Sequence, residues 1–158
     1  MPCYTSLACT RPPMPRVSIA AETQRTVIER AHSCCEYCQS RADYATASFA
    51  VEHIVPISRG GTSDLSNLAL SCSGCNGHKY NKTEGPDPTD GTTAPFFNPR
   101  QQRWQDHFCW NEAYTHIIGV TPTGRATVEA LRLNRPGLVN MRQVLYGIGK
   151  HPPDRPES

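Results

Sequence analysis

Two Cys-x-x-Cys pairs limit what this chain can fold into more than any other feature of its sequence. The first pair is Cys35 and Cys38, and the second is Cys72 and Cys75. Four thiolates in two such knuckles can hold one tetrahedral Zn²⁺. Hydrophobic residues make up only 37% of the 158 residues. We therefore expect a small core that depends on a bound metal for its stability.

The eight cysteines of the chain allow two interpretations, disulfides in a secreted protein or metal ligands in a cytosolic one. Residues 1–16 are polar and Pro-rich and lack the apolar run of a signal peptide. No segment approaches the roughly 20 apolar residues of a membrane span. Knuckle spacing favours metal, and we expect a cytoplasmic protein. Cys34 could compete with Cys35 as a ligand, and Cys3 and Cys9 are expected to be free thiols.

Several polar residues lie between and beside the two pairs. Glu52 and His53 are adjacent, Asn67 precedes the second pair, and Asn76 and Lys79 follow it. Hydrolysis of a phosphodiester needs such groups, because a base must deprotonate water and positive charge must offset the developing negative charge. His53 is the candidate base, since a neutral imidazole can accept a proton near physiological pH. Each of these residues also has an alternative without a catalytic role. His53 could be a hydrogen-bonded structural histidine of a strand, and Glu52 a solvent-exposed acid. Asn67 could be a turn residue, and Lys79 a surface lysine.

Hydrophobic periodicity predicts the elements that carry these residues. A helix is expected over residues 18–32, leading into the first knuckle. A strand is expected over residues 49–55, in which alternation places Glu52 and His53 on opposite faces. Pro56 and a Gly-Gly pair end it, and residues 67–71 form a short return strand. A further helix should begin near the second knuckle and carry Asn76 and Lys79.

The second half of the chain is less informative. Residues 84–95 are rich in Pro, Gly and Thr and are predicted to be a loop or linker. Short strands are expected at 104–110 and 115–120, and a helix at 123–134. We predict a disordered tail at residues 1–16, a nuclease core at 17–83 and a loop at 84–95. An extension that packs on the core follows at 96–145, and a second disordered tail at 146–158.

The order of motifs in the first half resembles the HNH endonucleases. The motifs are Phe-x-Val-Glu-His-Ile-Val-Pro, then Gly-Gly, then Asp-Leu-Ser-Asn-Leu, then Cys-x-x-Cys-Asn-x-x-Lys. The resemblance covers roughly residues 25–82. It implies an α+β fold, with a small ββα-metal core stapled by a structural zinc, an N-terminal helix and a C-terminal strand-helix extension. It also implies a metal-dependent endonuclease that hydrolyses DNA.

The resemblance implies that a catalytic Mg²⁺ or Mn²⁺ is held by Glu52 and Asn76. The family more often has Asp at the position of Glu52. His78 is the alternative ligand, because the last residue of the family motif is often His. Residues two apart on a helix differ by roughly 200° in direction, so both cannot point at one ion. Asn76 directly follows Cys75, where the last ligand of the family lies, and is therefore preferred.

The remaining roles are also implied by the resemblance. His53 is the general base, Asn67 orients it by bonding backbone across the loop, and Lys79 contacts phosphate. A non-catalytic zinc-knuckle module that binds nucleic acid is the alternative function. The net charge of +2 neither requires nor excludes a DNA partner, so affinity would come from local clusters of charge. Sequence specificity and oligomeric state are not indicated.

Two tryptophans and three arginines of the second half have a possible role in DNA contact. Trp104 and Trp110 could stack on bases, but packing in the core is the preferred interpretation. Arg100, Arg103 and Arg125 are interpreted as a solvated face.

Overall fold

The structure is a computed structural model, and it describes residues 17–154. The predicted tail at 1–16 and the last four residues of the predicted tail at 146–158 lie outside the described residues. The helices are α1 (Ala21–Arg30), α2 (Ser73–Lys79), α3 (Trp104–His107), α4 (Pro122–Ala130) and α5 (Pro136–Gly147). The strands form three antiparallel pairs, which are β1 (Ala50–His53) with β2 (Leu68–Ser71), β3 (Glu84–Pro86) with β4 (Thr93–Pro95), and β5 (Phe108–Trp110) with β6 (Ile117–Gly119).

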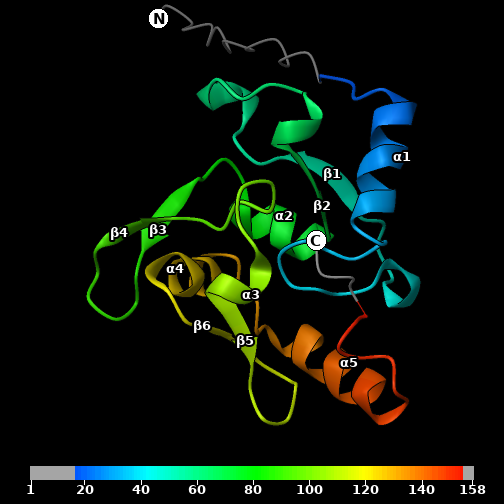
Figure 1. Cartoon of the computed structure of the whole chain (residues 1–158), viewed down its shortest axis with the longest axis vertical. Coiled ribbons are helices and arrows are strands. Elements are labelled where there is room, and N and C mark those ends of the chain that lie inside the picture. The colour runs from blue at the N-terminus through cyan, green and yellow to red at the C-terminus, as the bar shows by residue number, and fades with distance from the viewer. Residues whose placement is uncertain (1–16, 155–158) are drawn as a thin grey trace, which may run out of the picture.

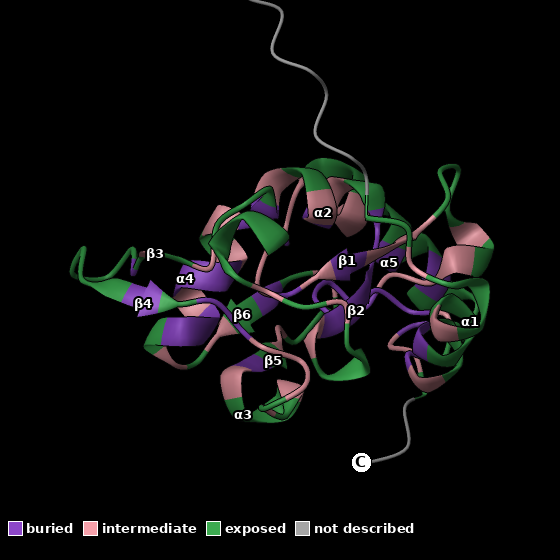
Figure 2. Cartoon of the chain, turned by 90° about the horizontal axis from the view of Figure 1, so that it is seen from above, coloured by how far each residue is buried: buried purple, intermediate pink, exposed green. Residues whose placement is uncertain are grey.

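The β1–β2 hairpin and α2 form the centre of the N-terminal half (Figure 1). In the hairpin, Val51 pairs with Leu70 and His53 pairs with Leu68. Helix α2 starts two residues after β2 ends, so the chain turns directly from the strand into the second knuckle. All four residues of β2 are buried, as Figure 2 shows. The ββα arrangement and the α+β class agree with the prediction.

Helix α1 covers one side of this hairpin and is shorter than the predicted helix over 18–32. Val27 and Ala31 are fully buried and pack with Leu68 and Leu70 of β2. The helix ends early because His32 and Ser33 take positive φ angles of 50° and 54°. This left-handed backbone cannot continue an α-helix. The turn delivers the chain into the first knuckle, as predicted.

The C-terminal extension shares a core with the knuckles. One hydrophobic cluster contains all four knuckle cysteines together with buried side chains of the extension, namely Phe97, Phe108, Ile117, Ala126, Leu131 and Leu133. Burial of this apolar surface joins the two halves, since removal from water stabilises by roughly 25 cal/mol per Å². Figure 2 shows the buried face of α4 toward this interior. The extension therefore packs on the segment that holds the two knuckles.

The predicted loop at 84–95 contains a β-hairpin instead. Strands β3 and β4 pair from Glu84 to Pro95 and lie against α4. Asp87 is buried between them and accepts hydrogen bonds from Arg125, with its Oδ2 2.7 Å from the Arg125 Nη2. Arg125 is thus held by an ion pair and is not part of a solvated face. The Pro- and Gly-rich composition indicated the turns but concealed the hairpin.

Two further expectations differ from the structure. The segment 104–110 begins as the short helix α3 before β5, so only its second half is a strand. The expected tail from residue 146 is ordered through the described part: His151 is buried, and its Nε2 lies 2.8 Å from the Tyr114 carbonyl oxygen. The His151 ring also packs against the Trp110 ring in a T-shaped arrangement, with 4.6 Å between the ring centroids. None of the described helices is long and apolar enough to cross a membrane.

Candidate metal centre and nuclease site

The four knuckle cysteines converge on one point. Their Sγ atoms all lie within 4.8 Å of one another, and all four residues are buried. The Cys38 and Cys72 sulfurs are 3.7 Å apart. Zinc–thiolate bonds of about 2.3 Å in a tetrahedron require sulfur–sulfur distances of about 3.8 Å. The donor set therefore fits a structural Zn²⁺, and the 3.7 Å separation is far longer than a disulfide bond.

Local structure builds each knuckle. Cys72 is the N-cap of α2, and its sulfur accepts a hydrogen bond from the Cys75 N–H at 3.5 Å. In the first knuckle, Gln39 has a φ of 62°, which turns the chain back after Cys38. Glu36 links the knuckle to β2, because its Oε2 accepts the Leu70 N–H at 2.9 Å. The Cys-x-x-Cys spacing thus fixes both ligand turns.

Arg135 lies at the edge of the sulfur cluster and was not found from the sequence. Its two terminal nitrogens lie 3.2 Å from the Cys72 sulfur and 3.6 Å from the Cys75 sulfur. Burial alone would lower the pKa of Arg135, but the nearby thiolates raise it overall. A Cβ at Gly74 would clash with this guanidinium, so glycine makes room for it. A fixed positive charge beside a four-thiolate site reduces its net negative charge.

Cys34 is not part of the cluster. Its sulfur lies 3.4 Å from the His32 carbonyl oxygen, and Cys35 supplies the fourth thiolate. Cys109 is exposed, and Cys3 and Cys9 lie outside the described residues. Of the two adjacent cysteines, Cys35 is thus the one whose sulfur lies in the cluster.

His53 closes β1 and is half-buried. Its Nε2 lies 2.9 Å from the Ser63 hydroxyl, which comes from the loop between the two strands. Burial lowers the pKa of His53 below its ordinary value of 6.5, and the positive charge of Lys79 lowers it further. The imidazole is therefore neutral at neutral pH, which is the form that can accept a proton.

Asn67 holds the loop that carries Ser63. Its Oδ1 accepts the Val55 N–H at 2.9 Å, and its Nδ2 donates to the Val55 and Thr62 carbonyl oxygens at 2.9 and 2.8 Å. A Cβ at Gly61 would clash with the Val55 carbonyl and with this amide. These are the backbone bonds across the loop that the sequence predicts for Asn67, and they fix the end of β1 next to His53.

Glu52 and Lys79 lie in a setting that differs from the expectation. The Lys79 Nζ is 2.9 Å from the Glu52 Oε2 and 3.1 Å from the His53 carbonyl oxygen. Both side chains are buried, with 2% and 6% exposure. The hydroxyl of the fully buried Tyr37 donates to the other Glu52 oxygen. Lys79 thus points at Glu52 inside the protein and does not reach out to a phosphate.

The alternation of β1 and the position of α2 explain this pair. Val51 packs with the α1 cluster, so Glu52 must point to the opposite face, toward α2. Burial raises the pKa of Glu52, whereas the Lys79 charge and the bonds from Tyr37 and Lys79 oppose that rise. The Lys79 side chain, within hydrogen-bond distance of the carboxylate, favours its charged form.

The expected catalytic ion does not fit Glu52 as it is arranged. One carboxylate oxygen accepts a hydrogen bond from Tyr37 and the other from Lys79, so a divalent ion at Glu52 would lie beside the positive charge of Lys79 and be repelled by it. Within residues 17–154, the cysteine cluster is the one group of three or more His, Cys, Asp or Glu side chains close enough to hold a metal. Asn76 is half-buried on α2, and no hydrogen bond of its side chain is found among the described residues.

His78 lies on α2 among positively charged side chains. Burial lowers its pKa first, and the positive charges of Arg132 and Arg135 lower it further. Those arginines flank the turn between α4 and α5, on the side of the sulfur cluster. The environment of His78 is thus cationic, which is unfavourable for a second cation.

Comparison with protein families identifies the segment that carries these residues. Residues 35–82 match the family model of the HNH endonucleases. This segment is an HNH domain. It begins at the first zinc knuckle and ends just after α2, so it includes the sulfur cluster, the hairpin, His53 and Asn67. No curated protein and no solved structure matches the chain. The HNH domain covers less than a third of the 158 residues.

Proposed function

We propose that this protein is an endonuclease that hydrolyses DNA phosphodiester bonds, with His53 as its general base. Nuclease activity is typical of the HNH family, to which residues 35–82 belong. The observation that carries the proposal is the fixed, neutral imidazole of His53. His53 lies at the end of β1, and its Nε2 is hydrogen-bonded to the Ser63 hydroxyl. The loop beside it is held by the hydrogen bonds of Asn67.

His53 would remove a proton from water as the water oxygen bonds to phosphorus. The phosphorus–oxygen bond to the leaving group then breaks, and that oxygen needs a proton or a nearby positive charge. Ser63 orients the ring, so the second ring nitrogen is the one left to take the proton. Asn67 serves indirectly, by holding the backbone that places Ser63. A general base of this kind contributes about 10²–10⁴ to the rate.

Mg²⁺ or Mn²⁺ is the proposed cofactor, because neutralisation of a phosphodiester by a divalent ion is a common route to its hydrolysis. Asn76 is the expected ligand whose side chain is available in this arrangement, and its carbonyl oxygen suits a hard ion. Glu52 could join it only against the repulsion of the Lys79 charge. A zinc held by the four knuckle cysteines would have a separate, structural part, since these cysteines lie in the segment before β1 and at the start of α2.

The test is incubation of zinc-loaded protein with supercoiled plasmid in Mg²⁺, in Mn²⁺ and after dialysis against EDTA. Conversion of supercoiled to nicked or linear DNA that requires the added ion supports the proposal. Binding without any conversion under all three conditions would instead support the zinc-knuckle module that binds nucleic acid without cleaving it. The buried Glu52–Lys79 pair is the observation that favours this alternative.

A further inference from the structure

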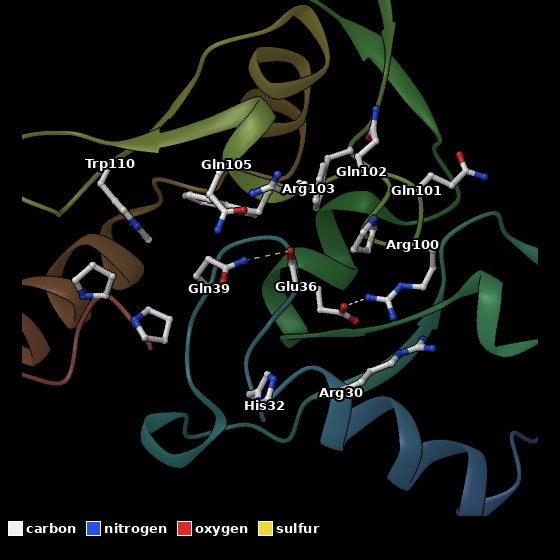
Figure 3. Close-up of a pocket in the computed structure, with 15 residues that line it drawn as sticks. Arg30, His32, Glu36, Gln39, Arg100, Gln101, Gln102, Arg103, Gln105 and Trp110 are labelled. Atoms are coloured by element: carbon white, nitrogen blue, oxygen red, sulfur yellow. Dashed lines mark hydrogen bonds and ion pairs between the residues drawn. The ribbon is translucent and has the colours of Figure 1, made fainter. Parts of the chain in front are cut away.

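A large open pocket lies between α1, the first knuckle and the segment that leads into α3 (Figure 3). Its volume is about 710 Å³, within the range of about 300–1,000 Å³ that is usual for ligand sites. Its lining includes charged and aromatic side chains, namely Arg30, Glu36, Arg100, Arg103, Trp104 and Trp110. Nothing in the proposed cleavage reaction uses this pocket.

The charge of the pocket is positive. Three arginines line it, against Glu36 as the one acidic residue. Glu36 is buried and forms an ion pair with Arg100, so its negative charge is already matched. Arg103 is exposed at the rim, and Figure 3 shows Arg30 and Arg100 on the same side of the pocket. A surplus of two positive charges in a concave site attracts an anion.

Arg30 connects the pocket to the catalytic hairpin. Its Nη2 donates to the Leu68 carbonyl oxygen at 2.7 Å, and Leu68 is the partner of His53 in the sheet. His53 shares a face of β1 with Val51, which is the face that α1 covers. The Nε of Arg30 is buried and has no hydrogen-bond partner among the described residues. A buried donor without a partner is costly, and an acceptor on a ligand would satisfy it.

The other wall of the pocket is aromatic. Trp104 and Trp110 pack together with ring centroids 5.5 Å apart. The Trp104 indole N–H donates to the Tyr37 carbonyl oxygen at 3.0 Å, which fixes the ring on the first knuckle. Both rings are half-buried, so each packs on the core and still lines the pocket. The Arg142 guanidinium lies 5.0 Å from the centre of the Trp110 ring and Phe108 packs on Trp104, so only the remaining part of each ring faces the pocket.

We propose that this pocket binds an unpaired nucleotide of the DNA substrate. Arginines are suited to phosphate oxygens, and tryptophan rings are suited to the flat face of a base. The base must be unpaired, because a base pair stacked in a duplex does not expose its face to a protein. The inference rests on the proposed DNA endonuclease function and specifies its substrate: DNA with single-stranded character close to the cleaved bond.

Intrinsic fluorescence tests the proposal in the unmodified protein, because the only two tryptophans of the chain line the pocket. The probe is a single-stranded oligothymidylate of about 12 nucleotides, compared with a duplex of the same length. Zinc-loaded protein is titrated in EDTA-free buffer without Mg²⁺ or Mn²⁺. We expect the single strand to quench the tryptophan fluorescence. The quenching should saturate at the same concentration as binding measured by fluorescence anisotropy, and the duplex should bind more weakly.

Variants show whether the arginines take part. Arg103→Ala should weaken binding and reduce the slope of log affinity against log salt by about 0.7, the value for one phosphate contact to a single strand. Arg30→Gln, which removes the positive charge and keeps a polar amide, should weaken binding as well. Arg25→Ala is the matched control, since Arg25 is exposed on the same helix and does not line the pocket.

The outcomes separate this inference from the proposed activity. Unchanged tryptophan fluorescence on addition of the single strand, or equal affinity of Arg103→Ala and wild type, would overturn the pocket assignment even if plasmid is cleaved. Quenching that Arg103→Ala weakens, in a protein that never cleaves plasmid, would keep the pocket and remove the endonuclease. Circular dichroism and zinc content confirm that the variants are folded.

Discussion

Replacing Lys79 by Met removes the positive charge that faces Glu52. The change keeps the unbranched shape and most of the volume of the side chain and shortens it by one heavy atom, so its main effect is loss of the charge. Glu52 would keep only the bond from Tyr37 and would remain buried at 6% exposure. Leaving one member of a buried ion pair without its partner costs about 3–5 kcal/mol.

That free energy is large compared with the stability of a domain of this size. For chains of about 150–250 residues, 1 kcal/mol shifts the melting temperature by about 2–4 °C. Lys79→Met should therefore lower the melting temperature by about 6–20 °C, with the zinc still bound. Lys82→Met is the matched control, because Lys82 is exposed and its loss should change stability by less than about 0.5 kcal/mol.

The double variant Glu52→Gln with Lys79→Met completes a thermodynamic cycle. Urea unfolding of the wild type, the two single variants and the double variant gives the coupling between the two positions. We expect the double variant to be more stable than Lys79→Met alone, since no charge is left buried without a partner. Additive effects, or a change below about 1 kcal/mol for Lys79→Met, would refute the argument that the two groups form a buried pair.

Three further predictions concern the site. Cleavage should rise with pH through the pKa of His53 and reach half its maximum below pH 6.5, because burial lowers that pKa and the base acts only when neutral; a pH profile of the cleavage rate checks this. Cys72→Ser should lose zinc and unfold the HNH domain, as measured by metal analysis and circular dichroism, since small metal domains draw their folding free energy from the ion. Asn76→Ala should need more Mg²⁺ for half-maximal cleavage and His78→Ala should not; the reverse result in a Mg²⁺ titration would exchange their roles.

Much of the HNH domain follows from local patterns in the sequence. The spacing of the cysteines predicts the sulfur cluster, because two-residue gaps form ligand turns without help from distant contacts. Alternation in residues 49–55 predicts which face of the strand Glu52 takes. The bonds of Asn67 across the loop were implied by the resemblance to the HNH family, and the structure contains them.

What the sequence concealed depends on distant contacts. Lys79 is a lysine near a helix end, and such residues are almost always exposed. Its burial becomes understandable only when Tyr37 and Glu52, far away in the chain, are seen around it. Arg135 at the sulfur cluster and His151 beside Trp110 are similar, because each comes from a segment whose composition gives no sign of its partner.

The cleavage rate of His53→Ala tests the central claim most directly. Wild type and variant are prepared with equal zinc content and equal helicity, and their initial rates on supercoiled plasmid are measured with the same concentration of Mg²⁺. If His53 is the general base, the rate of the variant falls by about 10²–10⁴ while its melting temperature stays close to that of the wild type. A variant that cleaves plasmid as fast as the wild type would contradict the proposed mechanism.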